Sequence, residues 1–153
     1  MAPTERTRGE PPVLVSACLL GMRTRYDGAH CRREKVLGLL GNCHFVPVCP
    51  EQMGGLATPR PPAEIEAGDG RAVLDGRSHI LRPDGLDVTE NFLRGARMVA
   101  ELAELTAARR AIFKEGSPSC GVTEIRRNGE PVAGCGVTTA LLQRKGLRVD
   151  GIR

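Results

Sequence analysis

Cysteines are the residues of this chain best suited to chemistry, and there are six of them among 153 residues. They stand at positions 18, 31, 43, 49, 120 and 135, and no two form a C-x-x-C pair. That short spacing is typical of zinc ribbons and of thioredoxin-type redox pairs, so the sequence argues against both. We expect either that some of these cysteines bind a metal or that they are buried as small apolar side chains.

Three of them, Cys18, Cys49 and Cys120, stand in loops that follow short apolar, β-branched runs. The strands predicted from these runs are residues 13–17, 44–48 and 111–114. Because the carboxyl ends of parallel strands meet at one edge of a sheet, the three thiols are expected to converge there. Three thiolates suit either a zinc ion with an open position or an iron–sulfur cluster in which one iron has no cysteine. The residues alone leave both centres open, with buried thiols as the third alternative.

Glu51, Ser117 and Lys114 stand in or beside the same loops and carry groups that could act on a bound molecule. The carboxylate of Glu51 could serve as a general acid or base. The hydroxyl of Ser117 could donate a hydrogen bond, and the ammonium group of Lys114 could hold an anion or lower the pKa of a thiol. Each of these residue types is common on ordinary surfaces, and their grouping at strand ends is what indicates a site.

The other cysteines and the histidines give weaker signals. Cys31 and Cys43 are expected to be buried or surface thiols. Cys135 could face the site, and the segment Gly134–Gly136, which opens a predicted helix, could bind a small anion through backbone N–H groups. No ligand spacing relates the three histidines, so they are expected to be structural. They are His30, His44 and His79.

The elements that must position these residues alternate between strands and helices. Helical spacing and a last apolar run predict helices over residues 32–40, 87–109 and 137–145 and a strand over 147–149. Asn128-Gly129 predicts a tight turn, and a small hairpin is expected over residues 64–74 around Gly68–Gly70. The alternation predicts an α/β fold, a single Rossmann-like domain over residues 11–153 with a mainly parallel sheet flanked by helices. Residues 1–10 are expected to form a flexible arm.

Composition narrows the classes of protein. Hydrophobic residues make up 41% of the chain and charged residues 26%, as in ordinary globular proteins. No apolar run is long enough to cross a membrane, and the N-terminal segment is polar, so we expect a cytoplasmic protein without a secretory leader. The net charge is +4, and the densest basic group spans residues 23–35, which is either a solvated surface or an anion- or RNA-binding patch. With one Tyr, three Phe and no Trp, the chain has few side chains on which nucleic-acid bases could stack.

An ordered set of motifs extends these expectations. The motifs are Ser16-Ala-Cys-Leu-Leu-Gly21, Arg25-Tyr-Asp-Gly28, Pro47-Val-Cys-Pro-Glu51, Gly54-Gly-Leu-Ala-Thr-Pro-Arg-Pro-Pro-Ala-Glu64, Asp87-Val-Thr89, Lys114-Glu-Gly-Ser-Pro-Ser-Cys-Gly121 and Gly134-Cys-Gly-Val-Thr138. In this order, over roughly residues 12–149, the chain resembles the TudS-type thiouracil desulfidase family, once described only as a domain of unknown function. Any one motif is weak, and the set is specific.

The resemblance implies a [4Fe–4S] cluster held by Cys18, Cys49 and Cys120, with one iron that has no protein ligand. It implies non-redox removal of sulfur from a small thiolated nucleobase or nucleoside such as thiouracil, giving uracil and sulfide. Glu51 and Ser117 match the residues implicated in catalysis in that family. We hypothesise that Glu51 deprotonates the attacking water and that Ser117 donates a hydrogen bond to the substrate. Further candidates for positioning the substrate are Lys114 and Asp27.

Three other functions fit parts of the pattern. A desulfidase could act on thiouridine within tRNA, although the few aromatic residues and the modest charge favour a small molecule. A cluster-dependent sulfurtransferase would insert sulfur instead, but such enzymes often activate the target carbon by adenylation and no P-loop is present. An iron–sulfur or zinc redox sensor would need neither Glu51 nor Ser117 beside the ligands.

Overall fold

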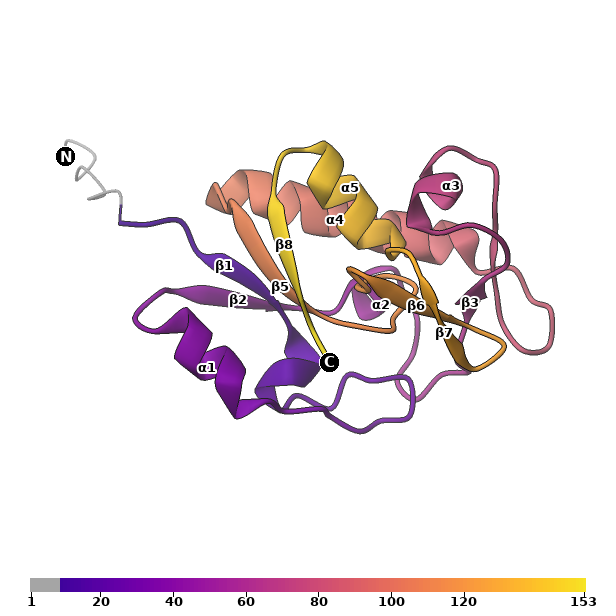
Figure 1. Ribbon diagram of the computed structural model, residues 1–153, viewed down its shortest axis with the longest axis horizontal. Coiled ribbons are helices and arrows are strands. Elements are labelled where there is room, and N and C mark those ends of the chain that lie inside the picture. Colours follow the sequence, from indigo (N-terminus) through magenta and orange to yellow (C-terminus); the bar gives the residue numbers. More distant parts are fainter. Residues whose placement is uncertain (1–8) are drawn as a thin grey trace.

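The computed structural model describes residues 9–153, and most of the predicted flexible arm lies outside this range. Its elements follow the predicted alternation closely (Figure 1). In chain order they are β1 (Val13–Ser16), the 3-10 helix η1 (Ala17–Leu20), α1 (Glu34–Leu40), β2 (Phe45–Val48), α2 (Pro50–Met53), β3 (Glu64–Ile65), α3 (Gly70–Leu74), β4 (Ile80–Leu81), α4 (Thr89–Thr106), β5 (Arg110–Lys114), β6 (Glu124–Arg127), β7 (Glu130–Ala133), α5 (Val137–Arg144) and β8 (Arg148–Ile152).

Four parallel strands form the central sheet, in the order β2-β1-β5-β8 (Figure 1). Ser16 lies opposite Val48 and Lys114 opposite Ile152, so the strands reach one edge of the sheet together. The prediction of an α/β fold with a mainly parallel sheet is confirmed. The last strand is longer than expected, because β5 pairs with it along its whole length.

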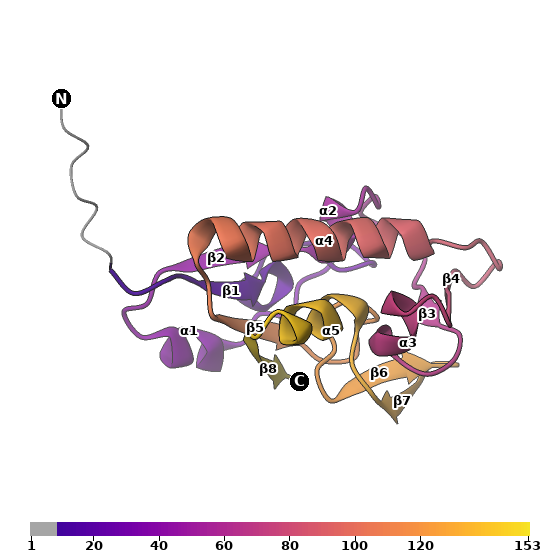
Figure 2. The ribbon, with the colours of Figure 1, turned by 90° about the horizontal axis from the view of Figure 1, so that it is seen from above.

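The two faces of the sheet bury different side chains, as alternation along a strand requires. On one face, Leu14, Phe113 and Val149 pack with residues of α4 and α5. On the other, Val15 and Ile112 pack with residues of η1 and α1. Figure 2 shows α4 and α1 on opposite sides of β1 and β2. The strands that lead into the cysteine loops are therefore held from both sides.

A further hydrophobic cluster lies beyond the carboxyl ends of the central strands. There β3, β4, β6, α3 and the first turns of α4 and α5 share buried residues such as Phe92 and Ile125. The predicted hairpin over residues 64–74 is wrong: β3 pairs with β4 instead. Asp69 begins α3, because its side chain accepts a hydrogen bond from the backbone N–H of Arg71 at 3.0 Å. The predicted Asn128-Gly129 turn is confirmed between β6 and β7, and both residues have positive φ.

The helix α2, which carries Glu51, was not predicted. It follows β2 directly, with Cys49 as its N-cap and Pro50 at its first position, where the missing N–H of proline does no harm. It packs against α4 so closely that a Cβ atom on Gly95 would overlap the carbonyl of Pro50. Over residues 9–153 no helix combines the length and the hydropathy that a membrane span requires.

Candidate active site

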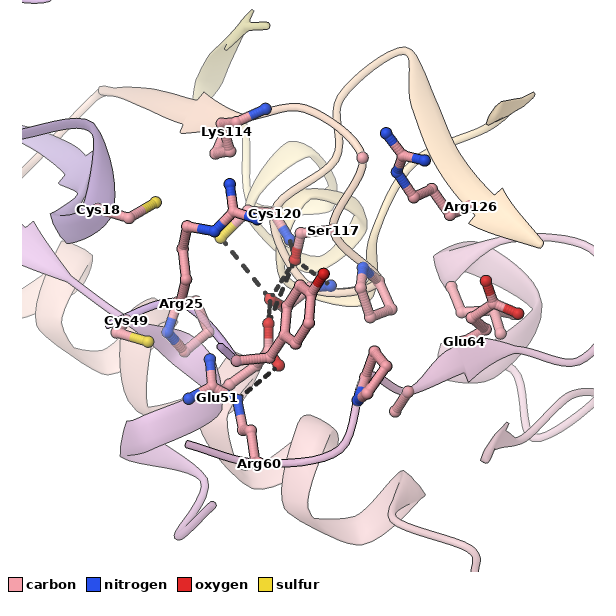
Figure 3. Close-up of a pocket in the computed structure, with 18 of the residues that line it drawn as sticks. Cys18, Arg25, Cys49, Glu51, Arg60, Glu64, Lys114, Ser117, Cys120 and Arg126 are labelled. Atoms are coloured by element: carbon pink, nitrogen blue, oxygen red, sulfur yellow. Dashed lines mark hydrogen bonds and ion pairs between the residues drawn. The ribbon is translucent and has the colours of Figure 1, made fainter. Parts of the chain in front are cut away.

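A pocket of about 940 Å³ opens at the edge where the central strands end. It is lined by residues that follow β1, β2 and β5 and by the segments that carry β3, β4 and the β6–β7 turn. Cys18, Cys49 and Cys120 are all among them, each from a different strand–loop junction (Figure 3). The predicted meeting of three distant thiols in one place is therefore what the fold produces, for the topological reason given above.

The three thiols lie near enough to influence one another. Burial is the main cause that raises the pKa of the Cys120 thiol, to about 12, and the neighbouring Cys49 contributes. The pKa of Cys18 is also raised, first by a hydrogen bond with the Cys31 thiol, then by burial and by Cys120 and Cys49. Cys49 donates from its thiol to the carbonyl oxygen of Thr24 at 3.8 Å. Each thiol is therefore at least partly buried, and all three face the same pocket.

Cys31 is a pocket residue that sequence reasoning missed. Its backbone N–H donates to the carbonyl oxygen of Cys18 at 3.0 Å. The neighbouring Cys18 thiol, together with Lys114 and Arg25, lowers the pKa of Cys31. No signal in the sequence identified this position, because Cys31 follows a glycine-containing loop rather than a strand.

Glu51 lies between a buried cation and two hydroxyl groups. Its Oε1 atom accepts a hydrogen bond from Nε of Arg60 at 3.0 Å. Its Oε2 atom accepts from the hydroxyls of Ser117 at 3.4 Å and Ser119 at 3.3 Å. Glu51 and Ser117, grouped by the sequence at neighbouring strand ends, are thus in contact, and Arg60 is a further partner of Glu51 that the sequence did not indicate.

The loop Ser117–Gly121 arranges its hydroxyls around Cys120. Oγ of Ser117 accepts from the backbone N–H groups of Ser119 and Cys120, both at 3.1 Å, and lies 2.9 Å from Oγ of Ser119. Oγ of Ser119, whose residue is only 1% exposed, also lies 3.7 Å from Sγ of Cys120, so its single proton has that sulfur and Oε2 of Glu51 as alternative acceptors. A short polar path therefore runs from Glu51 through Ser119 to the sulfur of Cys120.

The same loop rests on the N-terminus of α5, and this corrects one prediction. The backbone N–H groups of Gly136, Val137 and Thr138 donate to carbonyl oxygens of residues 121, 118 and 119, at 2.8, 2.8 and 3.0 Å. In the predicted anion cradle itself, the N–H of Gly134 donates to the carbonyl of Thr123 at 3.1 Å and that of Cys135 to the carboxylate of Asp69 at 3.2 Å. All three N–H groups of Gly134–Gly136 therefore have acceptors within the protein, and the prediction that they bind a separate anion is wrong. A side chain at Gly136 would overlap the backbone of Ser119, which explains why glycine stands there.

The two predicted substrate-positioning residues lie differently. Lys114 lines the pocket, and its ammonium group donates to the carbonyl of Glu115 at 3.2 Å. Asp27 is not among the lining residues. Its carboxylate pairs with Arg25, at 3.2 Å, and accepts from the backbone N–H of Ala29 at 3.0 Å. Arg25 does line the pocket, with its guanidinium over the ring of Tyr26, so Asp27 contacts a pocket residue without lining the pocket itself.

The remaining candidates lie elsewhere in the described chain. Cys135 is buried against Asp69, which accepts from its thiol at 3.6 Å, and burial raises the pKa of this thiol to about 11. Cys43 packs beneath α1. None of the three histidines lines the pocket within residues 9–153. The described cysteines are all free thiols.

The donor set fits an iron–sulfur cluster. A [4Fe–4S] cluster takes its thiolates on different irons, so its ligands surround the cluster instead of meeting at one point. Within residues 9–153, no three His, Cys, Asp or Glu side chains are placed to share a single metal ion. Three thiols around one pocket, with a hydroxyl beside Cys120, match the surroundings that such ligands need.

The chain is similar over most of its length to a solved structure and to a known bacterial protein. A structure described as the [4Fe-4S]-dependent thiouracil desulfidase TudS superposes with a TM-score of 0.78 and 42% identity, covering 93% of this chain and 91% of that one. Protein YbbK of Bacillus subtilis (strain 168) is 44% identical over 140 residues, 90% of this chain and 93% of its own length. The family model described as 2-thiouracil desulfurase matches residues 13–151. The chain belongs to the 2-thiouracil desulfurase family.

Proposed function

We propose that this protein is a [4Fe–4S]-dependent desulfidase that removes sulfur from a thiolated pyrimidine base, giving the oxo base and sulfide. The observation that carries the proposal is the composition of the pocket. It unites the thiols of Cys18, Cys49 and Cys120 with one carboxylate, Glu51, that contacts the hydroxyl of Ser117. The family to which the chain belongs and the TudS structure it resembles support the same activity.

Cys18, Cys49 and Cys120 are the residues that would hold the cluster. With three protein thiolates, the bound cluster supplies one iron without a protein ligand, a Lewis acid suited to the thiocarbonyl sulfur of the substrate. A reducing, cytoplasmic setting would keep these thiols available. A hydrogen bond from the hydroxyl of Ser119 to Cys120 would offset part of the negative charge on that thiolate.

Protein side chains activate the attacking water and accept its proton. Glu51 is the general base: its Oε2 atom takes a proton from the water that attacks the thiolated carbon. Ser117 stands within hydrogen-bond reach of this oxygen and donates to the substrate or to the departing sulfur. Lys114 supplies a positive charge at the pocket wall, which favours a substrate that gains negative charge during the attack. Arg25, held by Asp27, adds a second cation.

A small molecule is the proposed substrate. The pocket volume of about 940 Å³ lies within the range of small-ligand sites and leaves room for a base beside a cluster. The attack requires only the thiolated ring to enter, so a free base or a nucleoside suffices. Thiouridine within tRNA is the alternative, and the same assay distinguishes it.

The test is anaerobic reconstitution followed by substrate comparison. The full chain is loaded with iron and sulfide, and iron, acid-labile sulfide and zinc are measured. Sulfide release is then followed with 2-thiouracil, 4-thiouracil and thiolated tRNA at equal concentrations. We expect a cluster and sulfide release from a thiouracil. A chain that loads zinc but no iron, or a loaded chain that releases sulfide from none of these substrates, would overturn the proposal.

A further inference from the structure

Arg60 is a buried arginine in the irregular segment between α2 and β3, and it faces the pocket (Figure 3). Only 6% of its side chain is exposed, against 17% for its partner Glu51. Its Nε atom donates to Oε1 of Glu51 at 3.0 Å. A nearly buried guanidinium depends on a carboxylate beside it, because its charge has lost most of its contact with water.

The rest of the Arg60 guanidinium is held by other segments of the pocket wall. Its Nη2 atom donates to the carbonyl oxygen of Thr24 at 2.9 Å. Its Nη1 atom donates to Oγ1 of Thr58 at 2.8 Å and to the carbonyl oxygen of Ala57 at 3.2 Å. The backbone N–H of Arg60 donates to the carbonyl of Tyr26 at 2.7 Å. These hydrogen bonds therefore hold the Arg60 side chain in place independently of its contact with Glu51.

These contacts connect Arg60 both to Glu51, the proposed general base, and to the backbone group that Cys49 contacts. The carbonyl of Thr24 that accepts from Arg60 also accepts from the thiol of Cys49 at 3.8 Å. Glu51 stands two residues after Cys49 on α2. One guanidinium thus connects the loop after β1 to Glu51 on the helix after β2.

The contact divides the two oxygens of Glu51 between two tasks. Oε1 is occupied by Arg60, and Oε2 is left for the hydroxyls of Ser117 and Ser119. A glutamate has three rotatable side-chain bonds, and a free one would sample several rotamers. Only Nε of Arg60 donates to Glu51, and the other guanidinium nitrogens hold this donor in place through contacts that a lysine ammonium group could not reproduce together.

We propose that Arg60 is a positioning residue for the desulfidation reaction: it holds Glu51 by one carboxylate oxygen so that the other is directed at the site where water attacks. The inference rests on the proposed function and on Glu51 as the base. Arg60 acts through Glu51 and makes no contact with the reacting atoms. Its removal should therefore lower the rate of the chemical step and leave substrate affinity nearly unchanged.

The experiment uses the reconstituted full chain with Arg60→Lys and Arg60→Gln, beside Arg110→Lys as a matched control. Arg110 also donates from Nε to a carboxylate oxygen at 3.0 Å, that of Asp150, at the far end of β5. Turnover per loaded cluster is measured with the thiouracil on which the wild-type chain is active. We expect kcat to fall about 10- to 100-fold in Arg60→Lys and further in Arg60→Gln, with KM changed less than about threefold. The control should match the wild type.

A double-mutant cycle separates positioning from general support of the fold. In a Glu51→Gln background, Arg60→Lys should cause no further loss of kcat, because the group on which it acts is already gone. A residue that only supports the fold would lower activity in both backgrounds. Crystal structures of the apoproteins give a readout without turnover: in Arg60→Lys, Oε2 of Glu51 should no longer lie at 3.3 Å from Oγ of Ser119.

Three results would overturn the inference. The first is wild-type turnover per cluster in both Arg60 variants. The second is an equal loss with and without Glu51. The third, decisive even when the variants take up no iron, is an apoprotein structure of Arg60→Lys in which Glu51 keeps its contact with Ser119. A wild-type chain that is inactive on every thiolated substrate would instead refute the proposed function, so the two failures are distinguishable.

Discussion

The backbone N–H of Cys31 donates to the carbonyl oxygen of Cys18 at 3.0 Å, and both thiols line the same pocket. The pocket therefore contains four thiols, of which three are proposed as cluster ligands. Cys31 thus contacts the 3-10 helix η1 that carries Cys18, and its own pKa is lowered by the neighbouring Cys18 thiol and by Lys114 and Arg25.

The first prediction separates ligands from neighbours. Cys18→Ala, Cys49→Ala and Cys120→Ala should each abolish stable uptake of iron, because the cluster would lose one of only three protein ligands. Cys31→Ala should retain iron at the wild-type stoichiometry. Iron and acid-labile sulfide per chain, measured after anaerobic reconstitution, check this. Cys135→Ala, outside the pocket, serves as the control. Loss of iron in Cys31→Ala with retention in Cys18→Ala would show that Cys31, and not Cys18, is the third ligand.

The second prediction concerns the general base. Glu51→Gln removes the proton acceptor and keeps a similar shape, so kcat should fall by about 10²- to 10⁴-fold with cluster content unchanged. Steady-state sulfide release under anaerobic conditions measures it. Glu104→Gln, at an exposed position of α4, is the control and should behave as wild type. Full turnover in Glu51→Gln with an intact cluster would show that another group accepts the proton.

The third prediction tests the close packing that holds α2. In Gly95→Ala the new methyl group would overlap the carbonyl of Pro50, so α2 and Glu51 must shift. We expect a loss of about 1–3 kcal/mol in the free energy of unfolding, typical of overpacking. Gly38→Ala is the matched control, because a Cβ atom there meets nothing within 4 Å.

Gly38 lies inside α1, where alanine should stabilise the protein by about 0.5–1 kcal/mol. Denaturant unfolding of both variants measures the two effects with opposite expected signs. Equal effects of the two substitutions would show that the contact between α2 and α4 relaxes without cost.

The fourth prediction uses the pH dependence of stability at Asp69. Burial raises the pKa of this carboxyl, but hydrogen bonds from the Arg71 side chain and from the backbone N–H groups of Cys135 and Arg71 outweigh it and lower the pKa from 3.8 to about 2. A carboxyl with a lowered pKa in the folded state stabilises the protein above its unfolded pKa. The stabilisation should be lost as pH falls from about 4 through about 2.

Asp69→Asn keeps a side-chain oxygen that can cap α3 but removes this titration. Its free energy of unfolding should therefore depend less on pH than that of the wild type across the same interval, and urea unfolding at a series of pH values measures the difference. Asp84→Asn, at an exposed turn, provides the comparison for a carboxyl on the surface. Parallel curves for wild type and Asp69→Asn would contradict the assigned cause.

Much of the fold could be predicted because its signals are local. Apolar β-branched runs marked β1, β2 and β5, and helical spacing marked α1, α4 and α5 to within a few residues. The expected hairpin over residues 64–74 was wrong because β3 has only two residues and pairs with a strand that comes later in the chain. The helix α2 has four residues, too few for any periodicity to appear.

The sequence by itself determined that Cys18, Cys49 and Cys120 would meet, with Glu51 and Ser117 beside them. Parallel strands end at one edge, so residues that follow those strands are brought together by topology alone. Only the tertiary structure decided that Arg60, Ser119 and Cys31 join them. Arg60 stands in an irregular loop, and nothing local fixes where such a side chain points.

At the N-terminus of α5 the sequence suggests a binding site that the tertiary structure does not provide. Its sequence, Gly134-Cys-Gly136 before a helix, suggests free N–H donors for an anion, yet each of these N–H groups already donates to an acceptor within the protein. Whether a backbone donor is free depends on which distant segment packs against it, and that is settled by burial and hydrogen bonding in the folded chain.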